Sequence, residues 1–185
     1  MANTDNPCGF KPLDNKPLRV TAYRIQGSEG TAYSENLFIG DMVTLSSGYI
    51  VVGTAGTGNH LLGAIVGFEC ITSGLAAGGY YPDDSSDDWY ALVADDPEQR
   101  FVAQCDGGGT LAQANVGETV NLKTTHSGNT TTNLSGQEID SSATAGAVTD
   151  QFRLLGLVDK PGNAWGANGE YIVVIHDHTL NQPVA

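Results

Sequence analysis

Residues 88–106, DWYALVADDPEQRFVAQCD, decide the fold that we predict for this chain. Two apolar runs, 89–94 and 100–105, flank the polar break DDPEQ within this stretch. In the second run, alternate residues from Phe101 to Cys105 fall on one side, and a period of two is typical of a half-buried strand. Pro97 lies in the break, and proline has no N–H to give to a strand ladder. We therefore predict two neighbouring antiparallel strands joined by an acidic turn, near the middle of an all-β domain.

Other runs rich in β-branched and aromatic residues predict further strands. These runs are 18–26, 37–39, 42–45, 49–52, 60–71, 118–122, 151–159 and 170–176. The last run is apolar on both faces, which favours the middle of a sheet or a subunit contact. Gly63 and Gly67 predict a bulge or bend, and 110–116 predicts one short helical turn with Thr110 as its N-cap. The predicted fold class is all-β, a small β-barrel or sandwich with an extended N-terminal arm and a long loop insertion.

The chain is expected to divide into an arm, residues 1–17, and a β-barrel domain, residues 18–185. Three prolines in the first seventeen residues preclude a helix there. Phe10 and Leu13 are the large apolar residues of the arm. Within the domain, 124–147 is dominated by Thr, Ser, Asn, Ala and Gly, so we expect it to form an exposed excursion between core strands.

Composition narrows the range of partners. The 185 residues include 8 basic and 21 acidic side chains, for a net charge of −13. Such a charge repels phosphate backbones and anionic lipid, so we expect neither nucleic acid nor membrane as a partner. The start, MANTDNPCGF, has no basic and apolar leader, and the three cysteines form no CxxC motif. We expect free thiols and synthesis in a reducing cytoplasm.

Candidate catalytic and metal-binding residues are sparse. Cys105 with a distant histidine, or His176 and His178 at i, i+2 on a strand, are the candidates for a small hydrolase. An acidic loop could in principle gather Ca²⁺, but its spacing does not fit the EF-hand pattern. Its carboxylates belong to Asp83, Asp84, Asp87 and Asp88. The glycine-rich run 53–59 lacks the lysine of a phosphate loop. We predict no enzyme, no cofactor and no metal.

Short motifs in a shared order resemble a known group of proteins. The opening Asn3-Thr4-Asp5, Pro7, Gly9-Phe10 and Pro12 resembles the "ANTD-x-P-x-GF-x-P" start of small structural proteins of tailed-bacteriophage heads. Ile39-Gly40-Asp41, and 94–97 followed by Phe101 and Gln104, are also similar to motifs of that group. The resemblance covers residues 1–106 in scattered motifs, while 124–147 matches nothing in it.

The resemblance implies a capsid decoration (cement) protein, β-rich and homotrimeric. Such a protein would sit on the outer capsid surface of the virion at three-fold or quasi-three-fold positions. It would bridge subunits of the major capsid protein. The group implies no catalytic residues. The implied contacts with the capsid or a neighbouring subunit come from the arm, at Asn3, Asp5, Pro7, Gly9 and Phe10.

One alternative is a virion-borne carbohydrate-binding domain, or a head-fibre or host-attachment β-domain. This hypothesis requires aromatic side chains that are exposed in a cleft. The candidates are Tyr80, Tyr81, Trp89 and Trp165. Alanine substitutions there would abolish glycan binding and spare assembly.

Overall fold

The computed structural model describes seven stretches of the chain: residues 3–13, 17–26, 35–70, 79–82, 88–124, 128–142 and 150–181. The protein is all-β, as predicted. In the described residues the helical segments are single 3₁₀ turns, Gln113–Asn115 and Thr179–Asn181. The first has Ala112 at its N-cap, so the prediction of Thr110 as the cap was wrong. None of the described helices is long and apolar enough to cross a bilayer.

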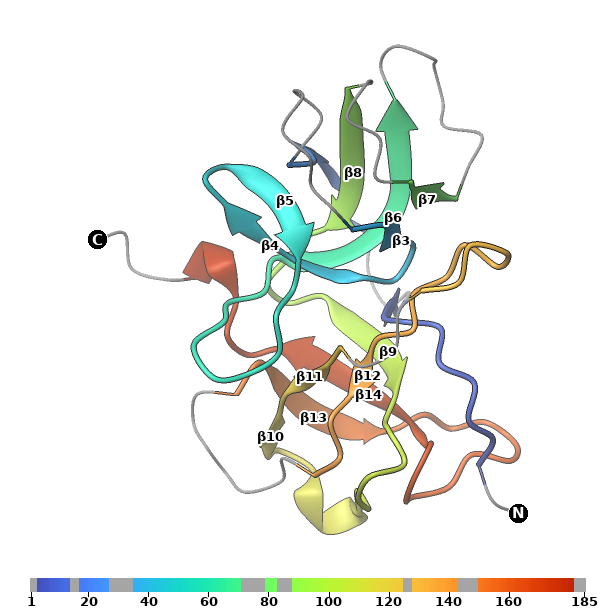
Figure 1. Cartoon of the computed structure of the whole chain (residues 1–185). Helices are drawn as coiled ribbons and strands as arrows, with labels where there is room; N and C mark the ends of the chain where they lie inside the picture. The colour runs from blue at the N-terminus through green and yellow to red at the C-terminus, as the bar shows by residue number, and fades with distance from the viewer. Residues whose placement is uncertain are drawn as a thin grey trace.

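Two five-stranded antiparallel sheets form the body (Figure 1). The N-terminal sheet has the order β2 (Thr21–Arg24), β8 (Trp89–Ala94), β6 (Gly63–Cys70), β4 (Met42–Ser46) and β5 (Tyr49–Val52). The C-terminal sheet has the order β1 (Lys11–Pro12), β9 (Arg100–Gln104), β14 (Glu170–Ile175), β13 (Phe152–Leu157) and β10 (Thr119–Val120). Both strand orders are open, which corresponds to a sandwich-like arrangement more than to a closed barrel.

Two short strand pairs complete the fold. β3 (Leu37–Phe38) pairs with β7 (Tyr80–Tyr81), and β11 (Leu122–Lys123) pairs with β12 (Glu138–Ile139). In β6 the register with β8 shifts between Ile65 and Gly67, which confirms the bulge predicted there. β14 lies between β9 and β13, so its predicted central position in a sheet is confirmed.

The two strands of the 88–106 stretch do not pair with each other. β8 is already hydrogen-bonded on both edges, to β2 and β6, and β9 is hydrogen-bonded to β1 and β14. The polar break 95–99 therefore carries the chain from one sheet to the other. Asp95 is fully buried at this crossing, where Tyr23 Oη donates to its Oδ2 at 2.7 Å and Arg19 Nε lies 3.2 Å from its Oδ1. The alternation predicted the strands correctly, but it carries no information on their partners.

A shared core joins the two sheets. Phe101, Phe152 and Tyr171 of the C-terminal sheet are buried in one cluster with Met42 and Ala94 of the N-terminal sheet. A second cluster lies within the N-terminal sheet. Its members include Ile65, Phe68, Trp89, Ala91 and Val93.

The described part of the predicted exposed excursion is exposed at residues 129–132 and buried at residues 135–139. Residues 135–139 are almost inaccessible to solvent, and most of them are polar. Met42 N–H donates to Gln137 Oε1 at 2.6 Å, and Ile139 bridges in parallel to Cys105. Residues 135–139 therefore connect the two sheets. The prediction of an exposed loop was wrong for these residues, because buried amides and hydroxyls resemble surface residues in sequence. Residues 125–127 and 143–147 of the excursion lie outside the described part.

Candidate functional site

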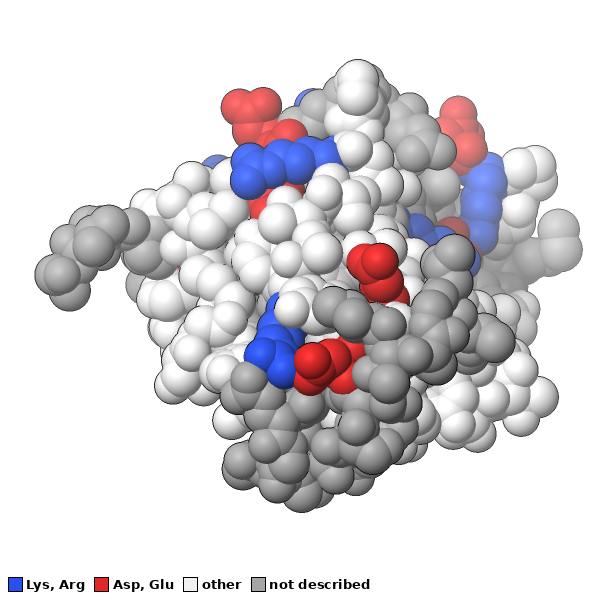
Figure 2. All heavy atoms as spheres, turned by 90° about the horizontal axis from the view of Figure 1, so that it is seen from above, with Lys and Arg blue, Asp and Glu red and all other residues white. Residues whose placement is uncertain are grey.

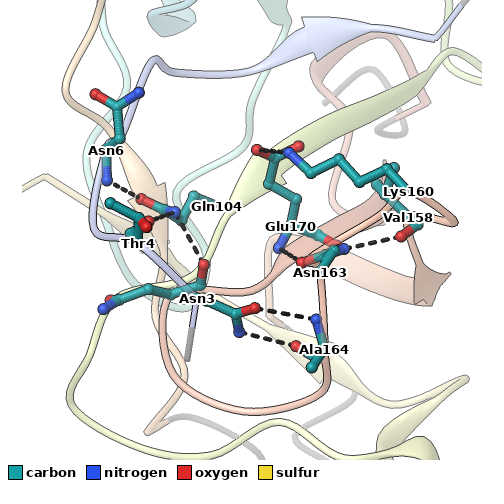
Figure 3. A network of polar contacts seen from close by, with 10 residues as sticks. Asn3, Thr4, Asn6, Gln104, Val158, Lys160, Asn163, Ala164 and Glu170 are labelled. Carbon is teal, nitrogen blue, oxygen red and sulfur yellow. Dashed lines mark hydrogen bonds and ion pairs between the residues drawn. The ribbon is translucent and has the colours of Figure 1, made fainter. Parts of the chain in front are cut away.

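A polar groove of about 580 Å³ runs between the start of the chain and the loop that precedes β14. Residues 3–8 form one wall, and residues 160–170 form the other (Figure 3). Gln104, at the end of β9, lies between the two walls. Asn3 and Asp5, two of the five contact residues predicted from the sequence, line this groove.

Asn3 fastens the first wall to the second. Its Nδ2 donates to Ala164 O and to Ala167 O, both at 2.9 Å, and its Oδ1 accepts from Ala164 N–H at 3.0 Å. A side-chain amide that both donates to and accepts from the backbone of one residue substitutes for a backbone partner. Asn3 is therefore held in place on the surface of its own chain.

Gln104 joins both walls to the C-terminal sheet. Its Oε1 accepts from Asn6 N–H at 2.9 Å, and its Nε2 donates to Thr4 O at 2.8 Å and Asn168 O at 2.9 Å (Figure 3). The residue is 6% exposed, so these bonds compensate for burying an amide. From the sequence, Gln104 was placed in a strand and among the motif residues of the resemblance, but no local signal marks it as a residue that connects the two walls.

The loop wall has its own internal support. Asn163 Nδ2 donates to Val158 O at 2.8 Å and Glu170 O at 2.9 Å, while its Oδ1 accepts from Glu170 N–H at 3.0 Å. Lys160 forms an ion pair with Glu170. Trp165 packs at a tilt against Tyr171, with ring centroids 5.4 Å apart. The groove is thus formed by groups whose positions are already fixed.

Gly9 and Phe10 are structural residues of the body, which corrects their assignment as contacts with another chain. Phe10 is 1% exposed and stacks on Phe152 with ring centroids 4.8 Å apart. Gly9 has φ of 69°, and a Cβ there would lie 2.5 Å from the Cβ of Ser135. Burial of a large apolar ring in the core is favourable. The next two residues, Lys11 and Pro12, pair with β9 as strand β1.

The remaining predicted arm residues stay at the surface. Asn3 is half-buried and Asp5 is exposed. Asp5 lines the groove described above together with a second groove of about 480 Å³, which Pro7 also lines. The N-terminal segment, residues 3–13, is therefore a docked strap and not a free arm.

The four candidate aromatic residues do not form one exposed surface. Tyr81 is fully buried and Trp89 is 7% exposed, and their rings meet edge to face in the N-terminal sheet. Tyr80 stacks on Phe38, whereas Trp165 lies on the loop beside the C-terminal sheet. Tyr81 and Trp89 were therefore misassigned, because the sequence does not show which face of a short strand is covered.

The candidate catalytic residues are not arranged for catalysis. Burial raises the pKa of Cys105 to about 11, and its Sγ–H donates to Gly166 O, so the thiol stays protonated at neutral pH. β14 ends at Ile175, and His178 is fully buried, where burial lowers its pKa and its Nδ1 accepts from Leu180 N–H. His176 lies after the end of the strand, with its Nδ1 3.4 Å from Nη2 of Arg153.

Among the described residues, no three His, Cys, Asp or Glu side chains are placed to bind one metal ion. Asp88 pairs with Arg24 at 2.5 Å. The other members of the predicted acidic loop, Asp83, Asp84 and Asp87, lie outside the described residues.

Comparison with known proteins identifies no relative. No family model matches the chain, and no curated protein or solved structure matches it significantly.

Proposed function

We propose that this chain is a capsid decoration protein. It binds the outside of a bacteriophage head at three-fold or quasi-three-fold positions, as a homotrimer, and stabilises the shell by bridging major capsid protein subunits. The ordered motifs of the N-terminal segment support this function by their resemblance to head proteins. The observation that carries it is structural: residues 3–8 lie on the surface, yet Asn3 and Gln104 hold them in one conformation.

A fixed surface segment suits a passive cross-linking role. A segment that is already ordered loses little conformational entropy when it binds, so more of the contact energy contributes to affinity. Symmetric repetition of a modest contact then gives strong retention by avidity. A body built from short, well-paired strands transmits load between its contacts without needing a moving part.

The carbohydrate-binding alternative has less support from the structure. Two of its four candidate aromatic residues, Tyr81 and Trp89, are in the core. The other two lie beside different sheets. A sugar-binding cleft needs stacking rings that converge, and these four do not.

Co-sedimentation with expanded heads that lack the protein tests the proposal. We expect the full chain to bind such heads and to have a solution mass three times the 19.3 kDa of one chain. Deleting residues 1–8 removes the surface part of the segment and leaves Phe10 and β1 in place. We expect this variant to keep a folded circular dichroism spectrum and to lose most head binding.

A matched control separates binding from folding. Val116→Ala changes one exposed side chain, 38% accessible, next to the 3₁₀ turn and away from the groove. It should bind heads as the full chain does. A full chain that neither trimerises nor sediments with heads would refute the proposed function, whereas undiminished binding by the deletion variant would refute only the role of residues 3–8.

A further inference from the structure

The strand registers define an outer face on the C-terminal sheet. Alternate residues of β9, β14 and β13 are buried in the core, so the residues between them point away from it. Directly paired residues share a face of a sheet. One row across this face is Lys11, Val102 and Ile172, and the next is Arg100, Val174 and Arg153. We call these six residues the outer face; the three strands lie side by side in the lower half of Figure 1.

The centre of the outer face is aliphatic. Val102, Ile172 and Val174 are all partly exposed and lie on adjacent strands. Partly exposed aliphatic side chains on a central strand leave apolar area that a partner can cover. The cations Lys11, Arg100 and Arg153 flank this centre, and each is exposed. On the remaining side, the same face of β14 continues to Glu170, which is paired with Lys160.

The charge pairing of the chain is uneven. Of the seven Lys and Arg residues that the structure describes, four form an ion pair with a carboxylate of the same chain. Those pairs are Arg19–Asp95, Arg24–Asp88, Lys123–Asp106 and Lys160–Glu170. Figure 2 shows blue side chains next to red ones on the face seen from above. Within the described stretches, the three basic residues without such a pair are Lys11, Arg100 and Arg153, and all three belong to the outer face.

This distribution points to an acidic partner. The chain has 21 carboxylates for 8 basic groups, so intramolecular partners are plentiful elsewhere. Three cations around an aliphatic centre have the arrangement of an interface, in which an apolar core is covered and charges at the rim select and steer the partner. The complementary surface carries carboxylates around an apolar centre.

We propose that the outer face of the C-terminal sheet docks onto an acidic surface of the capsid shell protein. This inference rests on the proposed function and names the partner surface that the decoration protein recognises. Face-to-face contact of two copies through the outer face would bring its three cations close to those of the second copy, and none of its six residues is a carboxylate that could pair with them. Like charges in contact disfavour such pairing, so the occupant is a different protein.

A charge reversal with a matched control tests the inference. Arg153→Glu changes the net charge by two units on the outer face, and Arg24→Glu makes the same change on the N-terminal sheet. We expect Arg153→Glu to weaken binding to expanded heads at least tenfold and Arg24→Glu to weaken it less than threefold. Binding of the unaltered chain should fall between 50 and 500 mM NaCl, and that salt dependence should be smaller for Arg153→Glu. Denaturant unfolding checks that both variants are folded. If Arg153→Glu does not fold, Arg153→Gln takes its place in the binding measurement.

Zero-length carbodiimide cross-linking identifies the occupant. The reagent joins an amine to a carboxylate in direct contact, so Lys11 should be linked to an Asp or Glu of the shell protein. A link from Lys11 to a second copy of this chain would overturn the inference, as would equal binding by Arg153→Glu and the unaltered chain. In either case, if the unaltered chain still binds heads, the proposed function stands and only the docking surface is refuted. If the unaltered chain does not bind heads, both the proposed function and the docking surface are refuted.

Discussion

Buried polar side chains connect segments that are far apart in this sequence. Gln151 Oε1 accepts from Leu122 N–H at 3.0 Å and Gly56 N–H at 3.2 Å, and its Nε2 donates to Thr54 O and Asn59 O, both at 2.8 Å. One fully buried amide thereby satisfies four backbone groups. Each such group would cost about 1–3 kcal/mol if it were left unpaired, so these side chains specify the fold as the apolar core does.

Asp41 and Asp106 should respond to pH in opposite directions. Burial raises the pKa of Asp41 from 3.8 to about 6, more than hydrogen bonds from Ser135 and Phe38 N–H lower it. Burial also acts to raise the pKa of Asp106, but hydrogen bonds from Ser141 and Lys123 outweigh it and leave that pKa lowered. Asp41 therefore favours folding most when it is protonated, and Asp106 when it is ionised.

Urea unfolding of the Asn variants at several pH values should show that the two carboxylates change stability with pH in opposite directions. The folded state binds the Asp41 proton more tightly than the unfolded state does. The stability that this proton contributes is therefore present below about pH 4 and is lost as the pH rises through about 6. Relative to the unaltered protein, Asp41→Asn should gain up to about 3 kcal/mol between pH 4 and pH 7. Asp106→Asn should be most destabilised at pH 7 and less so at acid pH. Parallel profiles for the two variants would contradict these assignments.

At the scale of elements, the N-terminal segment is part of the body. β1 adds two residues to the edge of the C-terminal sheet, and Leu13 N–H donates to Arg100 O at 2.8 Å. Phe10 fills a site against Phe152. The segment is therefore an edge element whose one large ring secures it.

Phe10→Ala should destabilise the protein by about 3–5 kcal/mol, because it removes a fully buried ring and leaves a cavity. Guanidinium unfolding measures the change. Leu18→Ala, in the segment before β2, is the control, since Leu18 is 41% exposed and should change stability by less than about 0.5 kcal/mol. Similar losses for the two variants would show that Phe10 is not held in the core.

Strand positions were predictable from the sequence, and strand partners were not. Alternation at 100–105 placed Phe101, Ala103 and Cys105 in the core correctly. The pairing of β9 with β14 depends on which edges remain available after β8 is enclosed, and no local pattern encodes that. The groove was partly predictable: the motif residues Asn3, Asp5 and Gln104 line it. The hydrogen bonds of Gln104 to Thr4, Asn6 and Asn168 join segments far apart in the chain and leave no mark on the neighbouring sequence.

At the scale of the whole molecule, we expect the two sheets to unfold as one cooperative unit, because they share a core. Met42 and Ala94 of the N-terminal sheet share a core cluster with Phe101 and Phe152 of the C-terminal sheet. Segment 135–139 is hydrogen-bonded or bridged to both sheets. Neither sheet can lose its packing without exposing apolar area on the other.

The two tryptophans allow a direct test, because Trp89 is in the N-terminal sheet and Trp165 lies beside the C-terminal one. Trp165→Phe and Trp89→Phe leave one reporter each. Each variant should show a single urea transition in which its fluorescence change coincides with its loss of circular dichroism. Fluorescence that changes ahead of the circular dichroism in either variant would indicate sheets that unfold separately.

The stacking of Phe10 on Phe152 also dictates the order of events during biosynthesis. An emerging polypeptide presents its tenth residue early, but the ring that receives it leaves the ribosome only near the end of translation. Such distant pairings slow folding, since a large loop must close before they form. We therefore expect the strap, residues 3–13, to settle only after Phe152 has been synthesised, and to remain accessible to proteases until then.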